Sequence, residues 1–570
     1  MQKAWEITPI NKTKCEGFSK ALNVSPLLAH LLLKRDISSV EDARVFISSN
    51  ISFLHDPFLL KDMEKAVERI EAAIENEEVI LIYGDYDVDG LTATALLFLI
   101  LKEYGARLTY YIPDRLKEGY GLNVEALKGT CKKGVGLVIS VDCGITSFEE
   151  VNYLKKQGID CIILDHHEPL KQILPNALAI IDPLQNKCGY PYKGLTSVGL
   201  VFKLALALRR KLKHKHVREL PPLEEHLDLV ALGTISDVAP VTGENRILIK
   251  HGLKYLATTR KRGLRALIEV AGIGRKRRFF TDTVGFILGP RINASGRVSS
   301  GLQALRLLLT DDEREAKILA EGLDKENQRR QSIEEVILKE AISKVERDVN
   351  FKSHRVIVIS SDKWHPGVIG IVASRIVEKF YRPTVLIAFN ENLGRGSGRS
   401  IKNFHLFEAL NKCKEHLVEY GGHEHAAGLT VFKDEIDAFR EQLNSIANEV
   451  LKPLDLIPRL EIDAEILFSD LTSKLIKELE LLEPFGVGNV KPVFAVRNLS
   501  LRSKPKIVNS NTLKLWVTDG ELTYEAVGFK RALDFKLDFT TNRFSLAFTP
   551  SANEWQGQEV IQLQLKDLRF

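Results

Sequence analysis

Short apolar runs recur along the first third of the chain, separated by stretches of mixed polarity. Between Val79 and about Ile181 these runs alternate with segments whose apolar residues are spaced as on one face of a helix. Short continuous apolar runs are typical of buried strands, and their alternation with helical patterns indicates βαβ units. The pattern therefore predicts an α/β domain built on a parallel sheet.

Helical patterns surround this region. The sequence predicts a short helical lead-in up to about Phe53, an amphipathic helix over Lys61–Ile74 and another helix over Val198–Leu212. The Thr-Asp-Asp-Glu segment at 310–313 has the spacing of a capping box. A charged helical run then extends to about Val349, and we expect it to connect two lobes.

The second half of the chain becomes strand-rich. Strand patterns at Val356–Ile359 and Thr384–Ile387 predict a second, smaller α/β domain that ends near Leu451, and Pro453–Pro458 indicates a linker. Further strands are predicted at 493–496, 513–517, 523–527 and 560–565. These changes predict five parts, with boundaries at 1–53, 54–309, 310–349, 350–452 and 453–570.

Acidic and histidine residues follow four of the apolar segments. Asp85, Asp87 and Asp89 follow Val79–Ile82, and Asp142 follows Leu137–Val141. His166 and His167 follow Asp160–Leu164, and Asp237 follows the helix-like segment Leu227–Gly233. In an open parallel sheet the carboxyl ends of the strands lie along one edge, and ligands bind there. We therefore expect convergence of Asp85, Asp87, Asp142, His166, His167 and Asp237.

Such a cluster predicts a divalent metal. Carboxylates that lie close together repel one another and are costly to bury without a positive partner. Carboxylates combined with imidazoles suit Mn²⁺ or Mg²⁺ better than Zn²⁺ without a thiolate. Each aspartate alone is explained as well by a helix cap or a turn, and only the recurrence in four segments favours metal binding. For Asp89, a turn beside Gly90 or a helix cap explains the residue at least as well as metal contact.

These motifs resemble those of a known superfamily. Asp165-His166-His167 is similar to the signature of the DHH phosphoesterases, and Gly84–Gly90, Val141–Gly144 and Ser236-Asp237 are similar to their other metal motifs. Three further segments narrow the resemblance to the RecJ family of single-strand-specific exonucleases: Gly289–Arg297, Gly396–Ser400 and Gly421–Gly428. The resemblance implies a parallel-sheet DHH domain, a long connecting helix, a smaller α/β DHH-associated domain and a C-terminal five-stranded OB-like barrel.

The resemblance also implies a reaction: 5′→3′ exonucleolytic hydrolysis of single-stranded DNA to 5′-mononucleotides with two metal ions, in DNA repair and recombination. Asp87, Asp142 and His167 would be catalytic, and His167 would stabilise charge at the scissile phosphate. One ion would be held by Asp87, Asp142, His166 and Asp237, and the other by Asp85 and Asp142. Leu81 stands where pyrophosphatase-like members have a histidine, so we expect one ion to be weakly held.

Substrate contacts are implied in the same way. The 5′-phosphate would be bound by Arg115, Ser397 and Arg399; the backbone near the cleaved bond by Arg291, Asn293 and Arg297; and the substrate also by His423. A Gly-rich hairpin at 396–400 and helix-end packing at 291–297 are the alternatives that need no ligand. On the barrel, aromatic residues would stack with bases. The candidates are Phe485, Phe494, Trp516, Tyr524 and Trp555.

Composition limits the remaining choices. The 570 residues are 44% hydrophobic and 27% charged, as in ordinary globular proteins of several domains. The apolar runs are too short for a membrane span, the start of the chain lacks signal-peptide features, and six scattered cysteines fit a reducing cytoplasm. The net charge of +5 is mild, but basic residues gather between Lys250 and Arg297 and over 209–216. Such runs are usually solvated faces, but the longer one adjoins the metal motifs, where we expect an anionic substrate to enter.

Two other functions remain open. One is a DHH hydrolase of short oligonucleotides or cyclic dinucleotides, which the large C-terminal domain and the basic run disfavour. The other is a non-catalytic replication scaffold, which the complete metal set disfavours. The residues do not distinguish DNA from RNA, so that assignment comes from the resemblance. We expect a cytoplasmic monomer without membrane contact that binds single-stranded DNA with a 5′ end; the resemblance allows a single-strand-binding protein and a helicase as partners.

Overall fold

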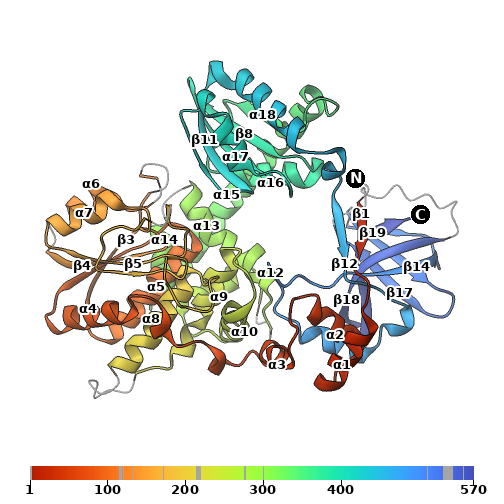
Figure 1. Ribbon diagram of the computed structural model, residues 1–570, viewed down its shortest axis with the longest axis horizontal. Helices are drawn as coiled ribbons and strands as arrows, with labels where there is room; N and C mark the ends of the chain where they lie inside the picture. The colour runs from red at the N-terminus through yellow and green to blue at the C-terminus, as the bar shows by residue number, and fades with distance from the viewer. Residues whose placement is uncertain are drawn as a thin grey trace. The chain divides into compact units, whose positions relative to one another are not determined.

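The computed structural model describes residues 3–114, 118–119, 121–131, 134–170, 173–212, 220–274, 278–298, 301–509, 511–529, 543–555 and 558–570 (Figure 1). The chain forms two compact units. The first contains Met1–Lys34, Gln328–Leu479 and Pro492–Phe570, and the second contains Arg35–Asn327 and Glu480–Lys491. Among the described residues, no helix is long and apolar enough to cross a membrane.

A parallel sheet forms the centre of the second unit, as the sequence predicts. Its strands run in the order β3 (Arg107–Tyr111), β2 (Val79–Tyr83), β4 (Val135–Val141), β5 (Asp160–Leu164) and β6 (Ala179–Ile181). Ile80 and Ile82 of β2 belong to one buried cluster, whereas Leu81 and Tyr83 belong to another on the opposite face. Alternate side chains of a strand point to opposite faces, so both faces of this sheet are buried.

Helices cover both faces of this sheet (Figure 1). The first face packs against α4 (Met63–Glu75), α5 (Val88–Glu103) and α8 (Ser197–Lys211), and the second against α6 (Val124–Cys131) and α7 (Phe148–Lys156). The helices predicted over 61–74 and 198–212 are thus confirmed within two residues at each end. The strand order reverses between β2 and β4, since β3 lies on one side of β2 and β4 on the other. Ligands of open α/β sheets bind at this kind of position.

Further helices complete the second unit. They are α3 (Val40–Ser48), α9 (Leu227–Ser236), α10 (Gly243–Ala257), α11 (Arg262–Val270), the short α12 (Thr281–Thr283), the π-helical η5 (Val284–Leu288), α13 (Gly289–Val298) and α14 (Leu302–Leu309). The buried guanidinium of Arg246 donates to the carbonyl oxygens of Leu481, Leu482 and Pro484 at 2.9, 2.8 and 3.2 Å. Arg246 thereby fixes the segment Glu480–Lys491 to α10.

The predicted connecting helix is present as α15 (Glu313–Asp348). Its start differs from the expected capping box. The Asp312 carboxylate accepts the amide of Glu315 at 2.7 Å, so Asp312 caps the helix, and the Thr310 hydroxyl instead donates to the Glu315 carboxylate. Two adjacent acidic residues can both cap a helix, and the sequence alone does not decide between them.

The first unit contains a mixed five-stranded sheet. Its order is β10 (Glu419–Gly422), β11 (Ala426–Phe432), β9 (Leu393–Arg399), β8 (Thr384–Asn390) and β7 (Ile357–Ser361). Only β7 and β8 are parallel. One face packs against α16 (Ile369–Phe380) and the end of α15, and the other against α17 (Leu406–Lys412) and α18 (Ile436–Val450). This is the predicted second α/β domain.

The C-terminal region forms the expected five-stranded barrel. A closed ring runs through β14 (Phe494–Leu501), β18 (Phe544–Trp555), β19 (Gln558–Arg569), β17 (Thr523–Gly528) and β16 (Thr512–Thr518), and β16 pairs back to β14. Two short strands, β13 (Ala464–Glu465) and β15 (Lys506–Val508), extend it. Phe494 is fully buried and cannot stack with a base, whereas Trp516 is 45% exposed. The side chain of Trp555 lies outside the described residues.

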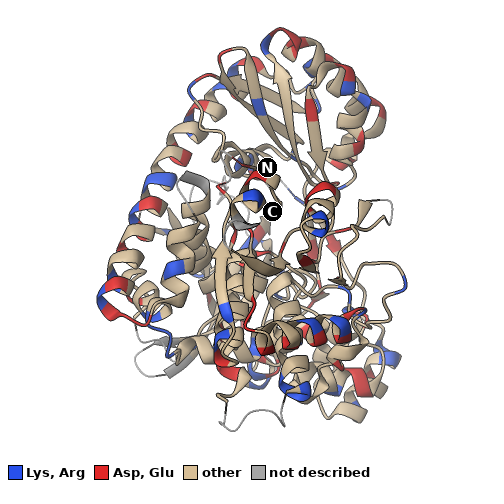
Figure 2. Ribbon diagram, turned by 90° about the vertical axis from the view of Figure 1, so that its left-hand side faces the viewer, with Lys and Arg blue, Asp and Glu red and all other residues tan. Residues whose placement is uncertain are grey.

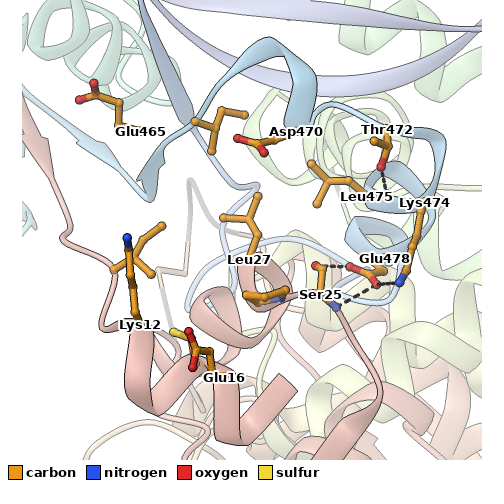
Figure 3. Close-up of a pocket in the computed structure, with 14 residues that line it drawn as sticks. Lys12, Glu16, Ser25, Leu27, Glu465, Asp470, Thr472, Lys474, Leu475 and Glu478 are labelled. Atoms are coloured by element: carbon orange, nitrogen blue, oxygen red, sulfur yellow. Dashed lines mark hydrogen bonds and ion pairs between the residues drawn. The ribbon is translucent and has the colours of Figure 1, made fainter. Parts of the chain in front are cut away.

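The N-terminal residues pack on the barrel. The sequence predicts only helices there, but β1 (Ala4–Ile7) pairs in parallel with β12 (Arg459–Ile462) and precedes α1 (Lys12–Leu22) and α2 (Pro26–Leu33). A pocket of about 410 Å³ lies between these helices and α19 (Ser473–Glu480) (Figure 3). Glu478 accepts both the amide and the hydroxyl of Ser25 at its edge. These polar groups join α2 to α19.

Candidate metal centre

The first aspartate motif leaves β2 at the reversal of strand order. Asp85 is buried, and Asp87 is the N-cap of α5, where its carboxylate accepts the amide of Gly90 at 3.1 Å. Asp142 follows β4, the next strand on the other side of the reversal. Asp142 has a left-handed backbone with φ of 64°. A non-glycine residue in this conformation stores strain, which is common at functional sites.

Three groups of ligand atoms lie in this crevice, and in each group all atoms lie within 4.8 Å of one another. The groups are Asp85, Asp87 and Asp142; Asp142, His166 and His167; and Asp89, His166 and Asp237. All six residues expected to converge therefore do so. Asp142 belongs to two of the groups, as a shared ligand must. Asp87, expected beside His166, is instead grouped with Asp85.

His166 lies among carboxylates from three segments. Its Nε2 lies 3.3 Å from Asp142 Oδ1, 3.8 Å from Asp89 Oδ2 and 3.9 Å from Asp237 Oδ2. This nitrogen is buried and has no hydrogen-bond partner among the described residues. A buried imidazole nitrogen facing carboxylate oxygens matches the donor set that Mn²⁺ and Mg²⁺ take in proteins. The residues present thus fit a divalent cation.

Electrostatics support the same conclusion. Burial raises the pKa of Asp142 well above its ordinary value, and the charges of Asp87 and Asp89 raise it further. Burial and the same neighbours raise the pKa of Asp237 to about 8. Burial, followed by the charge of His167, lowers the pKa of His166 to about 4. Without a cation, carboxylates here therefore retain protons at neutral pH, while His166 is already neutral and ready to ligate.

Asp165 has a role that the sequence alone does not reveal. Its buried carboxylate accepts Nδ1 of His167 at 2.7 Å, the amide of His166 at 2.8 Å and the amide of Ile145 at 3.0 Å. Burial alone would lower the pKa of His167, but the hydrogen bond and charge of Asp165 outweigh it and raise the pKa to about 9. Asp165 thus keeps His167 protonated and fixes the loop after β5.

Asp237 is held by the end of α9. The amide of Val238 donates to the carbonyl of Ile235 at 3.2 Å, and the amide of Ala239 donates to that of Thr234 at 3.4 Å. This pair of bonds is a Schellman motif, in which glycine usually occupies the left-handed position. Here Val238 occupies it with φ of 61°, and its side chain is 65% exposed. The motif ends the helix immediately after Asp237 and turns that carboxylate towards His166.

Helix α13 lies directly against the metal loops. A Cβ atom at Gly289 would lie 2.5 Å from Ser236 Oγ, and one at Gly296 would lie 2.8 Å from the carbonyl oxygen of Tyr86. These glycines are seven residues apart and share one helix face, so they let the backbone approach both loops. Asn293, four residues after Gly289, lies on the same face of the helix.

The other predicted substrate residues of this unit differ in placement. The Arg291 guanidinium pairs with Asp324 at 2.8 Å and donates to the carbonyl of Ile287 at 2.6 Å, so it also anchors α13 to α15. Arg115 and the side chain of Arg297 lie outside the described residues.

Ser397 and Arg399 belong to β9 in the first unit. Arg399 donates to the Ser397 hydroxyl at 3.2 Å. A Cβ atom at Gly370, in the first turn of α16, would lie 2.9 Å from Ser397 Oγ and 3.2 Å from a guanidinium nitrogen of Arg399. Both side chains therefore lie at a helix N-terminus, where anions are favoured. His423 follows β10 in the turn that leads to β11, and its amide donates to the carbonyl of Ala426 at 2.8 Å.

Three basic residues of the run at 250–297 have partners within the protein. Lys250 donates to the carbonyl of Ile47 at 2.8 Å, Lys261 pairs with Asp228 at 2.7 Å, and Arg278 pairs with Glu483. Figure 2 shows Lys and Arg interspersed with Asp and Glu over the outer helices. These three residues stabilise helix packing, and the charge count of this segment overstates its positive charge towards a substrate.

Comparisons with known proteins agree with this architecture. Residues 79–234 match the DHH family N-terminal domain, 353–449 the DHHA1 domain and 462–567 the RecJ OB domain. The chain is 39% identical to the single-stranded-DNA-specific exonuclease RecJ of Bacillus subtilis over 99% of this chain and 70% of that protein. It is 33% identical to the Escherichia coli protein of the same name, covering 95% of this chain and 96% of that one. A crystal structure of Thermus thermophilus RecJ with Mn²⁺ superposes with a TM-score of 0.84 at 31% identity, covering 100% of this chain and 79% of that one.

Proposed function

The chain belongs to the RecJ family of single-stranded-DNA-specific exonucleases, and we propose that it removes 5′-mononucleotides from a 5′ end of single-stranded DNA, as an enzyme of DNA repair and recombination. The observation that carries this proposal is the convergence of six metal-ligand candidates on Asp142 and His166 at the strand-order reversal. Relatives of known structure bind Mn²⁺ or Mg²⁺. The same ions suit this donor set.

In this proposal Asp85, Asp87 and Asp142 would hold one ion, and Asp142, His166 and Asp237 would hold the other. Two such ions would lower the pKa of a bound water and offset charge on the scissile phosphodiester. The Asp165 carboxylate accepts a hydrogen bond from Nδ1 of His167 and would orient the ring, so that the other ring nitrogen donates to the phosphate as negative charge develops. Asn293 and Arg291 of α13 would orient the backbone beside these groups, together with Arg297.

The ion nearest Asp85 is expected to bind more weakly. Leu81, two residues from the end of β2, is buried in the apolar cluster on the second sheet face. A histidine there would add a nitrogen ligand, and Leu81 adds none. The site therefore has one ligand fewer than it would have with a histidine at position 81, and we expect its ion to be retained mainly with bound substrate.

Direction follows from a terminal-phosphate site. Ser397 and Arg399, next to the first turn of α16, provide a hydroxyl, a guanidinium and a helix N-terminus for a 5′-phosphate. His423 and Arg115 would add contacts to the same substrate. A site that binds the terminal phosphate would explain exonucleolytic cleavage from the 5′ end.

The barrel would provide a further binding surface for the strand. Trp516 is exposed on β16, where Lys514 of the same strand lies opposite Lys506 of β15, and Arg502 donates its amide to the carbonyl of Trp516. An exposed indole on an OB-like barrel is suited to stacking with bases in sequence-independent single-strand binding. In this division, the five parts predicted from the sequence serve as N-terminal segment, catalytic domain, connector, DHH-associated substrate-binding domain and nucleic-acid-binding barrel.

The remaining assignments follow from this substrate. We place the protein in the cytoplasm, which agrees with free cysteines at 15, 143, 161, 188 and 413. It would act as a monomer, with a single-strand-binding protein and a helicase that supply unpaired DNA.

The test is digestion of single-stranded DNA labelled at either end, with Mn²⁺, Mg²⁺ or EDTA. The wild-type protein should release labelled mononucleotide from the 5′ end at once and require a metal. Asp87→Ala and Asp142→Ala should both be inactive. Faster cleavage of dinucleotides than of long strands, or strand binding without release of mononucleotides by metal-replete protein, would rule the proposal out.

A further inference from the structure

Asp142, the residue shared by the two proposed metal positions, contacts α8. The hydroxyl of Ser197 donates to Oδ1 of Asp142 at 3.0 Å. Ser197 is completely buried and Asp142 is 1% exposed, so this hydrogen bond forms away from solvent. It joins α8 to the loop after β4.

The position of this hydroxyl is fixed by the start of the helix. Thr196 is the N-cap of α8, and Ser197 is the first helical residue. The amides of Ser197 and Val198 donate to the two carboxylate oxygens of Asp89 at 2.7 and 3.1 Å. The first turn of α8 contains no acidic residue of its own, so Asp89 supplies the negative charge that a helix N-terminus favours.

Asp89 therefore acts on α8, whereas the sequence allows a turn, a cap of its own helix or metal contact. Asp87 caps α5, and Asp89 reaches across to the next layer. The result is a chain of contacts from α5 through Asp89 to the start of α8, and from Ser197 to Asp142. Because each member is buried, its geometry is maintained by packing as well as by hydrogen bonds.

The hydroxyl contacts a particular oxygen of Asp142. Oδ1, which accepts from Ser197, is also the atom 3.3 Å from Nε2 of His166. The terminal torsion of an aspartate has broad, weakly restricted minima, so a carboxylate without such a donor rotates easily. The Ser197 hydrogen bond therefore favours the orientation of the Asp142 carboxylate in which Oδ1 lies on the His166 side.

We propose that Ser197 is a positioning residue for Asp142, which fixes the orientation of this shared carboxylate and thereby strengthens metal binding. The inference rests on the proposed metal centre but adds to it a residue outside the ligand set. Groups that orient metal ligands typically contribute a factor of about 10 to 100 in metal affinity. A packing role alone would affect folding stability without this effect on metal binding.

The test is calorimetric titration of the metal-free, full-length protein with Mn²⁺. Ser197→Ala should bind Mn²⁺ about tenfold more weakly than the wild type. Ser197→Gly, which also lacks the hydroxyl, should show the same loss, and Ser197→Thr, which keeps it, should bind like the wild type. Ser49→Ala is the matched control, because Ser49 is also buried and its hydroxyl donates to the carbonyl of Phe46 at 2.7 Å.

Thermal unfolding without metal checks that the variants are folded. Unchanged Mn²⁺ affinity in Ser197→Ala, or an equal loss in Ser49→Ala, would overturn the inference and leave the proposed function standing. If the wild type bound no Mn²⁺, or bound it no more tightly than Asp142→Ala, the metal centre and this inference would both be overturned. Loss of affinity in Ser197→Thr equal to that in Ser197→Ala would show that the hydroxyl is not responsible.

Discussion

Metal binding to this centre should release protons at neutral pH. Burial, with the charges of Asp89 and Asp87, raises the pKa of Asp237 to about 8, and burial raises the pKa of Asp142 well above its ordinary value. A divalent ion requires these carboxylates to be deprotonated. A group with a pKa of about 8 is roughly nine-tenths protonated at pH 7, so Asp237 alone should release about 0.9 proton per ion bound. His166, with a pKa of about 4, should release none.

The assay is calorimetric titration of metal-free protein with Mn²⁺ in buffers that differ in ionisation enthalpy. The slope of observed enthalpy against buffer enthalpy gives the number of protons released. The affinity for Mn²⁺ should also rise about tenfold per displaced proton between pH 6 and 7, where the high-pKa carboxylates are mostly protonated. Asp237→Asn should release about one proton fewer. Binding with no proton release and no change in affinity across this range would refute the electrostatic reasoning.

Three further predictions concern single residues. Trp516→Ala should weaken binding of metal-free protein to single-stranded DNA by about 1–3 kcal/mol in fluorescence anisotropy, and unchanged affinity would remove this residue from the binding surface. Val238→Gly should raise the free energy of unfolding in urea by about 1 kcal/mol, because glycine relieves the left-handed strain; a loss of stability would contradict this. Asp165→Asn should move the pKa of His167, followed by NMR in metal-free protein, down from about 9 towards 6.5. Because that pKa is raised in the folded state, the wild type should exceed Asp165→Asn in free energy of unfolding by the largest amount below about pH 6.5. This difference should diminish as the pH rises through 9, and a difference that grows with pH would contradict the prediction.

Hydrophobic periodicity predicted the parallel sheet and the connecting helix. The runs before Asp85, Asp142 and His166 are short and apolar on both faces, as buried strands of a parallel sheet are. Strand ends of a parallel sheet share an edge, which is why the six ligand candidates could be grouped before their geometry was known. The barrel followed from family resemblance more than from pattern.

Other features depend on contacts between distant segments. Asp89 and Ser197 are 108 positions apart, so no local sequence pattern shows that the Asp89 carboxylate accepts the first amide of α8, which belongs to Ser197. The partners of Lys250 and Lys261 likewise lie far away in sequence, so a charge count could not show that they are engaged. Strand β1 was missed because four residues beside a helical segment give too weak a signal, and its partner β12 lies more than 450 residues away.

The central claim is that two metal ions share Asp142 at the carboxyl edge of the sheet. Anomalous diffraction from crystals of the protein grown with Mn²⁺ tests it most directly. The account predicts two peaks, one between Asp142 and His166 and one between Asp142 and Asp85, with the second weaker at low Mn²⁺. Strong Mn²⁺ peaks elsewhere, with none within coordination distance of Asp142, would contradict it.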